Sequence, residues 1–455
     1  MRLFLQRLII IAGYAVLLSF AALTIPLRIP EILQVAASRG FESLSMPAWI
    51  AQAPDSAPLN YFVQLPFLLA LGYTRLGARL DSLLFALAAC YVFFRLVRRI
   101  GIAHPILAVM VFLLLPVHAQ LASQGLPFEQ GLFFLLLATE WFLRLLERPQ
   151  IGTAVVYTVL LTLCAYSDSY AFLPAIGYLL FLLVFVNRAQ ERRALWFGLS
   201  ATVAAAILFL PYYAWAAPQV NPYWPTRPDL YGNALERAAG NEQIGFVLLA
   251  LFAMGILTAA GGAIRWGAAA SPKRVSLVCL LGGAISAFVL TPVLDFALGE
   301  SFTPDQLLWA TPALVLVVFA GIERFASRGW MRALVPLFAG MLILLCAAGN
   351  YFERLLPAED TEAEAALIAP ELTSDACVVF VSERFSKPLF QLFQPGLKER
   401  ECLTFSHERI VLASHPYVGP EQQTNAESFF RGLNFSETKR IRSGGGQIVI
   451  MQQIR

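Results

Sequence analysis

Acidic and basic side chains gather in one long segment near the N-terminus, residues 28–80. The segment includes Glu31 and Asp55, two carboxylates whose surroundings suit acid/base chemistry. It also carries four arginines: Arg28, Arg39, Arg75 and Arg79. A carboxylate can take a proton from a hydroxyl, and arginines bind phosphate through several hydrogen bonds. The segment therefore suits a general base next to an anion site, and an interfacial loop with ordinary charges is the alternative.

Further polar residues stand in or beside short connections between apolar segments: Gln124, Glu129 and Asp168. Several of the candidate residues have a purely structural alternative. Glu129 opens an apolar segment, and an acidic residue stabilises a helix N-terminus. Asp168 can cap the next helix, and Asp55, which follows a proline, can form a turn. Arg79 can simply anchor a helix end at a membrane interface.

Several common kinds of site are absent from the sequence. It contains no Walker-type phosphate loop and no Gly-x-Ser-x-Gly nucleophile motif. Its four histidines show no metal-ligand spacing, so no dedicated metal site is expected. The formal net charge of +3 is too small to indicate a nucleic-acid partner. A nucleotide or nucleic-acid partner is therefore not expected.

The elements that position these residues are predicted to be membrane helices. The chain is 58% hydrophobic and 14% charged, whereas soluble domains carry roughly a quarter charged residues. A spanning helix needs roughly 20 apolar residues, because backbone polar groups find no water in the bilayer. The first apolar run is interpreted as a retained helix, with a cleaved signal peptide as the alternative. About eleven spans are expected: 8–27, 81–97, 105–117, 129–146, 152–165, 171–187, 194–213, 244–263, 275–292, 306–322 and 333–349.

The distribution of arginine and lysine predicts the orientation of these helices. Basic residues fill alternate connections, those near residues 95–99, 144–148, 188–193, 265–274 and 324–332. The short connections 118–128, 166–170 and 293–305 contain neither Lys nor Arg. Because cytoplasmic loops are enriched in these residues, the N-terminus is expected in the cytoplasm. An odd number of spans then places residues 350–455 outside.

The composition changes near residue 350, from long apolar runs to a more polar and charged segment, which predicts two domains. Residues 1–349 form the transmembrane domain, with the first outer loop at 28–80, and residues 350–455 form a small α/β domain. Three β-like runs are expected in the second domain: 377–382, 409–413 and 447–452, with a turn at Gly444–Gly446. Cys377 and Cys402 would face an oxidising compartment and could pair, but two cysteines alone leave this open.

The order of these features resembles the GT-C superfamily of membrane glycosyltransferases. The similar branch is the bacterial one that includes protein O-mannosyltransferases and lipid A aminoarabinose transferases. The resemblance covers most of the chain, and it rests on the relative positions of these features more than on strict motifs. The stretches that carry the resemblance are Leu27–Glu31, Asp55–Tyr61, Ala78–Ser82, Leu115–Gln124 and Leu307–Val318. The departures are Pro30 at the first acidic position, no arginine in 123–128, and Asp168 and Asp305 where the family has His and Arg.

The resemblance implies transfer of a sugar, with inversion, from a polyprenyl-phosphate donor to a hydroxyl of a glycan, lipid or protein. It places the protein in the cell inner membrane with a periplasmic C-terminal domain. Glu31 or Asp55 would be the base, and a divalent metal is used by some relatives. The remaining residues would bind donor phosphate or substrate: Arg28, Arg39, Arg75, Arg79, Tyr61, Gln124, Glu129 and Asp168. The alternatives are a non-catalytic binding or assembly subunit, or a transporter of a lipid-linked saccharide.

Overall fold

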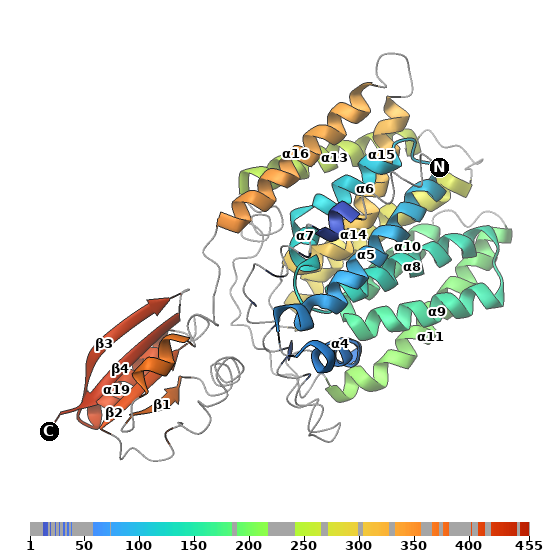
Figure 1. Ribbon diagram of the computed structural model, residues 1–455. Coiled ribbons are helices and arrows are strands. Elements are labelled where there is room, and N and C mark those ends of the chain that lie inside the picture. The colour runs from blue at the N-terminus through green and yellow to red at the C-terminus, as the bar shows by residue number, and fades with distance from the viewer. Residues whose placement is uncertain are drawn as a thin grey trace. The chain divides into compact units, whose positions relative to one another are not determined.

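The computed structural model in Figure 1 shows a helical part and a part built around a β-sheet. It describes residues 12–16, 19, 23, 27, 31, 34, 35, 38, 58–72, 74–183, 189–216, 242–264, 272–298, 304–326, 333–355, 366–372, 376–381, 402, 408–414, 420–443 and 446–454. The chain divides into two compact units. The helical unit comprises Met1–Phe20, Ile50–Gln64 and Arg79–Leu355, and the second unit comprises Ala21–Trp49, Leu65–Ala78 and Leu356–Arg455.

The apolar segments form helices close to where the sequence predicts them. They are α4 (Pro58–Leu71), α5 (Arg75–Ile100), α6 (Pro105–Leu114), α7 (Pro116–Ala122), α8 (Phe128–Glu147), α9 (Ile151–Ser167), α10 (Leu173–Leu183), α11 (Ala189–Ala216), α13 (Glu242–Ile264), α14 (Pro272–Leu298), α15 (Thr311–Phe325) and α16 (Leu334–Leu355). Two 3-10 turns, η1 (Ser169–Phe172) and η2 (Pro304–Trp309), precede α10 and α15. Most of the first predicted span, 8–27, lies outside the described residues.

Within the described residues, three helical segments are long and apolar enough to cross a membrane. They are Arg75–Ile100, Gln190–Tyr212 and Leu334–Tyr351. The pair α6 and α7 adds a fourth if it forms one span bent by 68°. The protein is therefore a mostly helical membrane protein, and the count of about eleven spans stays a prediction.

The bend between α6 and α7 follows from Pro116. Proline has no backbone N–H and cannot continue the hydrogen bonds of α6. The carbonyl of Leu114 instead accepts a hydrogen bond of 2.8 Å from the side chain of Asn350 on α16. The predicted segment 105–117 is thus two short helices, and the second one points in a new direction.

Helices α10 and α14 are in contact through glycine. A Cβ added to Gly177 would lie 2.1 Å from the carbonyl oxygen of Gly282. Small residues at a helix interface allow such a close backbone approach in membranes. The hydroxyl of Ser286 on α14 donates a hydrogen bond of 2.9 Å to the carbonyl of Leu173 on α10. This contact fixes the start of α10 against its neighbour.

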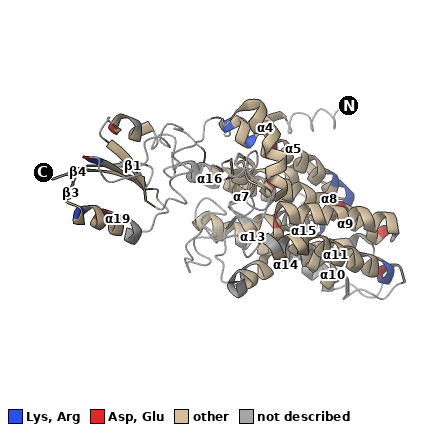
Figure 2. Cartoon of the chain, turned by 90° about the horizontal axis from the view of Figure 1, so that it is seen from below, with Lys and Arg blue, Asp and Glu red and all other residues tan. Residues whose placement is uncertain are grey.

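One end of the helical unit is held by ion pairs. Glu140, a charged residue within α8, contacts Arg95 of α5 at 2.5 Å and Arg144 at 2.6 Å. Near the same ends of these two helices, Arg99 pairs with Glu147 at 2.7 Å. Figure 2 shows that charged residues lie mainly at helix ends. Because Glu140 is almost fully buried, these arginines compensate a charge that would otherwise be costly to bury.

The second unit contains a four-stranded mixed sheet of order β1-β2-β4-β3. The strands are β1 (Ala376–Phe380), β2 (Arg409–Ser414), β3 (Phe435–Ser443) and β4 (Gly446–Gln453), and α19 (Pro420–Gly432) leads into β3. β1 and β2 are parallel, whereas β4 is antiparallel to both of its neighbours. The three predicted strands are confirmed. The chain reverses between Ser443 and Gly446, where a turn is predicted, although Gly444 and Gly445 lie outside the described residues.

The sheet buries apolar side chains on both faces. One face holds Val378, Val411 and Ile448, and the other holds Ile410, Val449 and Phe430 of α19. This alternation matches the two-residue period of a strand. The strand β3 is not predicted from the sequence because its residues are highly charged. β3 is an edge strand, where charged side chains prevent pairing with other chains.

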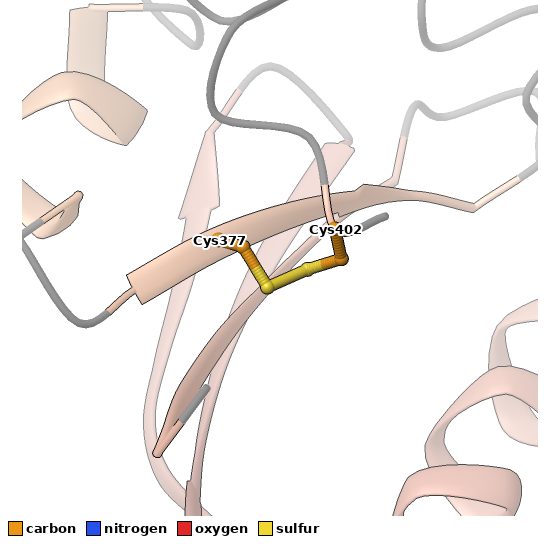
Figure 3. Close-up of a disulfide and its surroundings, with 2 residues drawn as sticks. All are labelled: Cys377 and Cys402. Atoms are coloured by element: carbon orange, nitrogen blue, oxygen red, sulfur yellow. A yellow bond between two sulfur atoms is a disulfide. The ribbon is translucent and has the colours of Figure 1, made fainter. Parts of the chain in front are cut away.

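A disulfide joins Cys377 of β1 to Cys402 (Figure 3). The backbone N–H of Cys402 also donates a hydrogen bond of 3.1 Å to the carbonyl of Val378. The chain that follows β1 is thus tied back to the edge of the sheet. The pairing that the sequence left open is present.

Removing this disulfide is expected to destabilise the sheet by about 3 kcal/mol, because it closes a loop spanning 25 residues. The measurement is hydrogen exchange of β1 and β2 in the full chain, comparing wild type with the double variant Cys377→Ser/Cys402→Ser. Reduced wild type should match the double variant. Equal protection in the oxidised and variant proteins would contradict the prediction.

Candidate active site

A buried histidine and a buried glutamate meet at the end of the helical unit opposite the ion pairs. Glu129 lies in the first turn of α8, and His118 lies in α7. Their side chains are both fully buried, with 3.5 Å between His118 Nε2 and Glu129 Oε2. The positive end of the α8 dipole also favours a carboxylate at this position.

The imidazole of His118 is held on several sides. Its Nδ1 lies 3.2 Å from the hydroxyl oxygen of Tyr14. The ring of Phe112 packs against it at 4.4 Å between centroids, and Phe93 stacks on Phe112 at 4.1 Å. Because α7 begins directly after the bend at Pro116, the chain directs His118 into this aromatic contact. The Nε2 atom is therefore aimed at Glu129 by packing.

Two neighbouring helices fix the connection between α7 and α8. The side-chain amide of Gln64 on α4 donates a hydrogen bond of 3.2 Å to the carbonyl of Gly125. The hydroxyl of Ser82 on α5 donates one of 3.1 Å to the carbonyl of Leu126. These contacts satisfy backbone groups that are costly to bury unpaired. They also hold in place the N-terminus of α8, which carries Glu129.

Several buried polar atoms in this unit have no hydrogen-bond partner among the described residues. They include both carboxylate oxygens of Glu129 and the side-chain amides of Asn60 and Gln130. The indole nitrogen of Trp309 is a further example. Burying such groups without partners costs free energy, so they mark places where a ligand or water can bind. Carboxylates and amides suit hydrogen bonds to hydroxyl groups.

Trp309 closes the site from the side of η2. A Cβ on Gly131, two residues after Glu129, would come within 2.8 Å of the Trp309 ring. The ring also contacts Phe128, with 6.2 Å between centroids. The first turn of α8 therefore lies directly against a large aromatic side chain.

Asp168 has the capping role that was considered as its alternative. Its Oδ1 accepts a hydrogen bond of 2.7 Å from the backbone N–H of Tyr170, at the start of η1. The thiol of Cys164 donates to the carbonyls of Gly131 and Ala171, which joins this turn to α8. Asp168 thus helps to shape the same end of the unit.

The predicted site residues differ in where the structure places them. Gln124 is buried in the α7–α8 connection near Glu129, and Tyr61 and Arg79 are buried in α4 and α5. Glu31 is buried and Arg75 is half-buried, and both belong to the second unit. Arg28, Arg39 and Asp55 lie outside the described residues. In the part of the chain that is described, no group of three His, Cys, Asp or Glu side chains is arranged to hold a metal ion.

Four further polar or aromatic residues near this region are not predicted from the sequence: His118, Asn60, Gln130 and Trp309. His118 is separated from Glu129 by 11 positions and from Tyr14 by 104. Its position two residues after Pro116 was the available signal, because a proline that ends one helix also reorients the side chains of the next. The contacts themselves depend on helix packing, which spacing in the sequence does not give.

Comparison with known proteins agrees with this architecture. The sequence matches no family model and no curated protein. The fold is similar to a crystal structure of ArnT from Cupriavidus metallidurans in the apo state, with a TM-score of 0.61, 13% identity and 97% coverage of both chains. It is also similar to ArnT from the same organism bound to undecaprenyl phosphate, with a TM-score of 0.58, 14% identity and the same coverage. The chain therefore has a fold similar to that of ArnT over nearly its whole length, which confirms the predicted resemblance at the level of the fold.

Proposed function

We propose that the protein is a glycosyltransferase of the cell inner membrane. It moves a sugar from a polyprenyl-phosphate donor to an acceptor hydroxyl on the outer face. The observation that carries this proposal is the fold shared with ArnT over 97% of both chains, including an ArnT structure bound to undecaprenyl phosphate. The buried polar atoms near Glu129 add support, since a sugar offers several hydroxyl groups to such atoms.

The two ends of the helical unit support an outward-facing site. Arg95, Arg99 and Arg144 lie near the C-terminal ends of α5 and α8, whereas Glu129 opens α8 at its other end. Cytoplasmic ends of membrane helices are enriched in arginine, which supports a position of Glu129 toward the outer face. The disulfide of the second unit also fits an oxidising compartment outside the cytoplasm.

The proposed mechanism takes its general base from the first outer segment. Glu31 or Asp55 takes the proton of the acceptor hydroxyl while that oxygen attacks the anomeric carbon. The donor phosphate leaves with the electrons of the broken bond. Its charge is held by arginine, whose planar donors suit phosphate. The candidates for this role are Arg28, Arg39, Arg75 and Arg79. Tyr61, Gln124, Glu129 and Asp168 are candidates for contacts with the substrate.

A second candidate is a non-catalytic subunit that binds a lipid-linked saccharide. The connection 123–127 lacks the arginine that the family resemblance would place there. Its backbone is instead bound by the neutral side chains of Gln64 and Ser82. A protein with this change could bind the donor without transferring its sugar.

Sugar transfer by the purified full chain separates the two candidates. The protein is reconstituted in lipid nanodiscs with a panel of synthetic polyprenyl-phosphate sugars and extracts of cell-envelope acceptors. The transferase proposal predicts that free polyprenyl phosphate and labelled acceptor appear together, in proportion to protein. Donor binding without release of polyprenyl phosphate for any sugar would favour the non-catalytic subunit.

Replacing Glu129 by Gln is expected to lower kcat for transfer by about tenfold to a hundredfold, the value of a charge-assisted hydrogen bond to substrate. The variant keeps the shape of the side chain and removes its charge. Glu147→Gln is the matched control, since this half-exposed glutamate lies at the other end of α8. Equal rates for the two variants would contradict a role for Glu129 in the site.

A further inference from the structure

The contact between His118 and Glu129 suggests a more specific role than burial. We propose that His118 is a positioning residue: its Nε2 holds the Glu129 carboxylate so that the carboxylate can accept hydrogen bonds from hydroxyls of the transferred sugar. This inference rests on the proposed function and adds a residue to it.

The first argument is the burial of Glu129. Its side chain is fully buried, and its oxygens have no hydrogen-bond partner among the described residues. A buried carboxylate needs a compensating partner, and His118 Nε2 is 3.5 Å from Oε2. The two groups make a polar contact without a hydrogen bond in this structure, so Nε2 and both carboxylate oxygens can still form hydrogen bonds.

The second argument is the direction of the proton on His118. The hydroxyl of Tyr14 lies 3.2 Å from Nδ1, and a neutral imidazole has one donor and one acceptor nitrogen. When Tyr14 donates to Nδ1, the ring proton is on Nε2, the atom that faces Glu129. The contact with Tyr14 is thus compatible with the tautomer that presents a donor to the carboxylate.

The third argument is the way in which the ring is held. Phe112 packs on the imidazole at 4.4 Å, and α7 starts at Pro116 after the 68° bend. The aromatic packing fixes the plane of the ring, and each ring nitrogen then faces one polar partner. Nδ1 faces Tyr14 and Nε2 faces Glu129. A residue that served only to fill space would be replaceable by any side chain of similar shape.

Substitutions of His118 test the roles of its two ring nitrogens separately. Gln places an amide near the position of Nε2 and can still donate to Glu129, whereas Asn places one near Nδ1 and reaches only Tyr14. Phe keeps the ring without either nitrogen. We expect about a tenfold loss of kcat in His118→Asn and His118→Phe, and about threefold or less in His118→Gln. KM for the donor should change less than kcat, because the donor lipid still binds.

The coupling to Glu129 is tested by a double-mutant cycle in the full chain, read out both by kcat and by the melting temperature without substrate. The double variant His118→Phe/Glu129→Gln should be no slower than Glu129→Gln alone, and the two losses in melting temperature should not add. Equal kcat values for His118→Asn and His118→Gln would overturn the proposal. So would a double variant whose losses in kcat and in melting temperature both equal the combined losses of the two single variants. If wild type transfers no sugar, the proposed function fails, and additive melting losses would separately overturn the pairing.

Discussion

Replacing the general base is expected to lower the rate of sugar transfer by about a hundredfold to ten-thousandfold, the usual contribution of acid/base catalysis. The variants are Glu31→Gln and Asp55→Asn, and only the one that removes the base should show the loss. Both replacements keep the shape of the side chain and remove its ability to take a proton. The donor should still bind, because the base contacts the acceptor and not the phosphate.

The measurement is single-turnover transfer together with binding of polyprenyl phosphate, each by the same preparation. Glu42→Gln is the control, since this glutamate belongs to the same segment and has no assigned role. Both Glu31→Gln and Asp55→Asn retaining wild-type rates would remove the first outer segment as the source of the base. Loss of binding together with loss of transfer would indicate a folding defect.

Gly177→Ala is expected to destabilise the helical unit by about 3 kcal/mol, the upper range for an overpacked core. Its Cβ would lie 2.1 Å from the carbonyl oxygen of Gly282 and 2.3 Å from the hydroxyl oxygen of Ser286. Neither helix can yield locally, because the nearest atom belongs to the backbone. Helices α10 and α14 would have to separate, which also disturbs the hydrogen bond from Ser286 to Leu173.

The matched control for this prediction is Gly340→Ala on α16. A Cβ at Gly340 meets nothing within 4 Å, so this variant should be neutral or more stable by up to about 1 kcal/mol, the gain in helix propensity. The thermal stability of both variants in detergent gives the comparison. Similar melting temperatures for the two variants would contradict the prediction, because they would show that α10 and α14 can accept a methyl group at Gly177 without loss of stability.

Much of the fold is predictable because apolar runs in a membrane protein have few alternatives to helices. The helices α8, α9 and α11 appear within a few residues of their predicted ends. The bend between α6 and α7 is missed because hydropathy continues through Pro116. In the second unit, β3 is missed because an edge strand can be charged, and a bulge between Glu437 and Lys439 breaks its register.

The candidate site is less predictable than the fold. Glu129 is selected by its place beside a short connection and by the family resemblance, and its role in the site stays a prediction. Its position in the first turn of α8 agrees with the structural alternative. Asp168 is correctly considered as a cap. His118 is missed because its significance comes from Tyr14 and Glu129, which distant segments bring to it. Polar contacts made by helix packing leave no local pattern in the sequence.

Binding of polyprenyl phosphate to the purified protein tests the central claim most directly. The full chain in nanodiscs is titrated with undecaprenyl phosphate, with undecaprenol and phosphatidylglycerol as controls for the phosphate and for general lipid binding. The proposed function predicts saturable binding of undecaprenyl phosphate that neither control lipid displaces. Equal binding of undecaprenol, or no saturable binding at all, would contradict the assignment of a polyprenyl-phosphate donor to this protein.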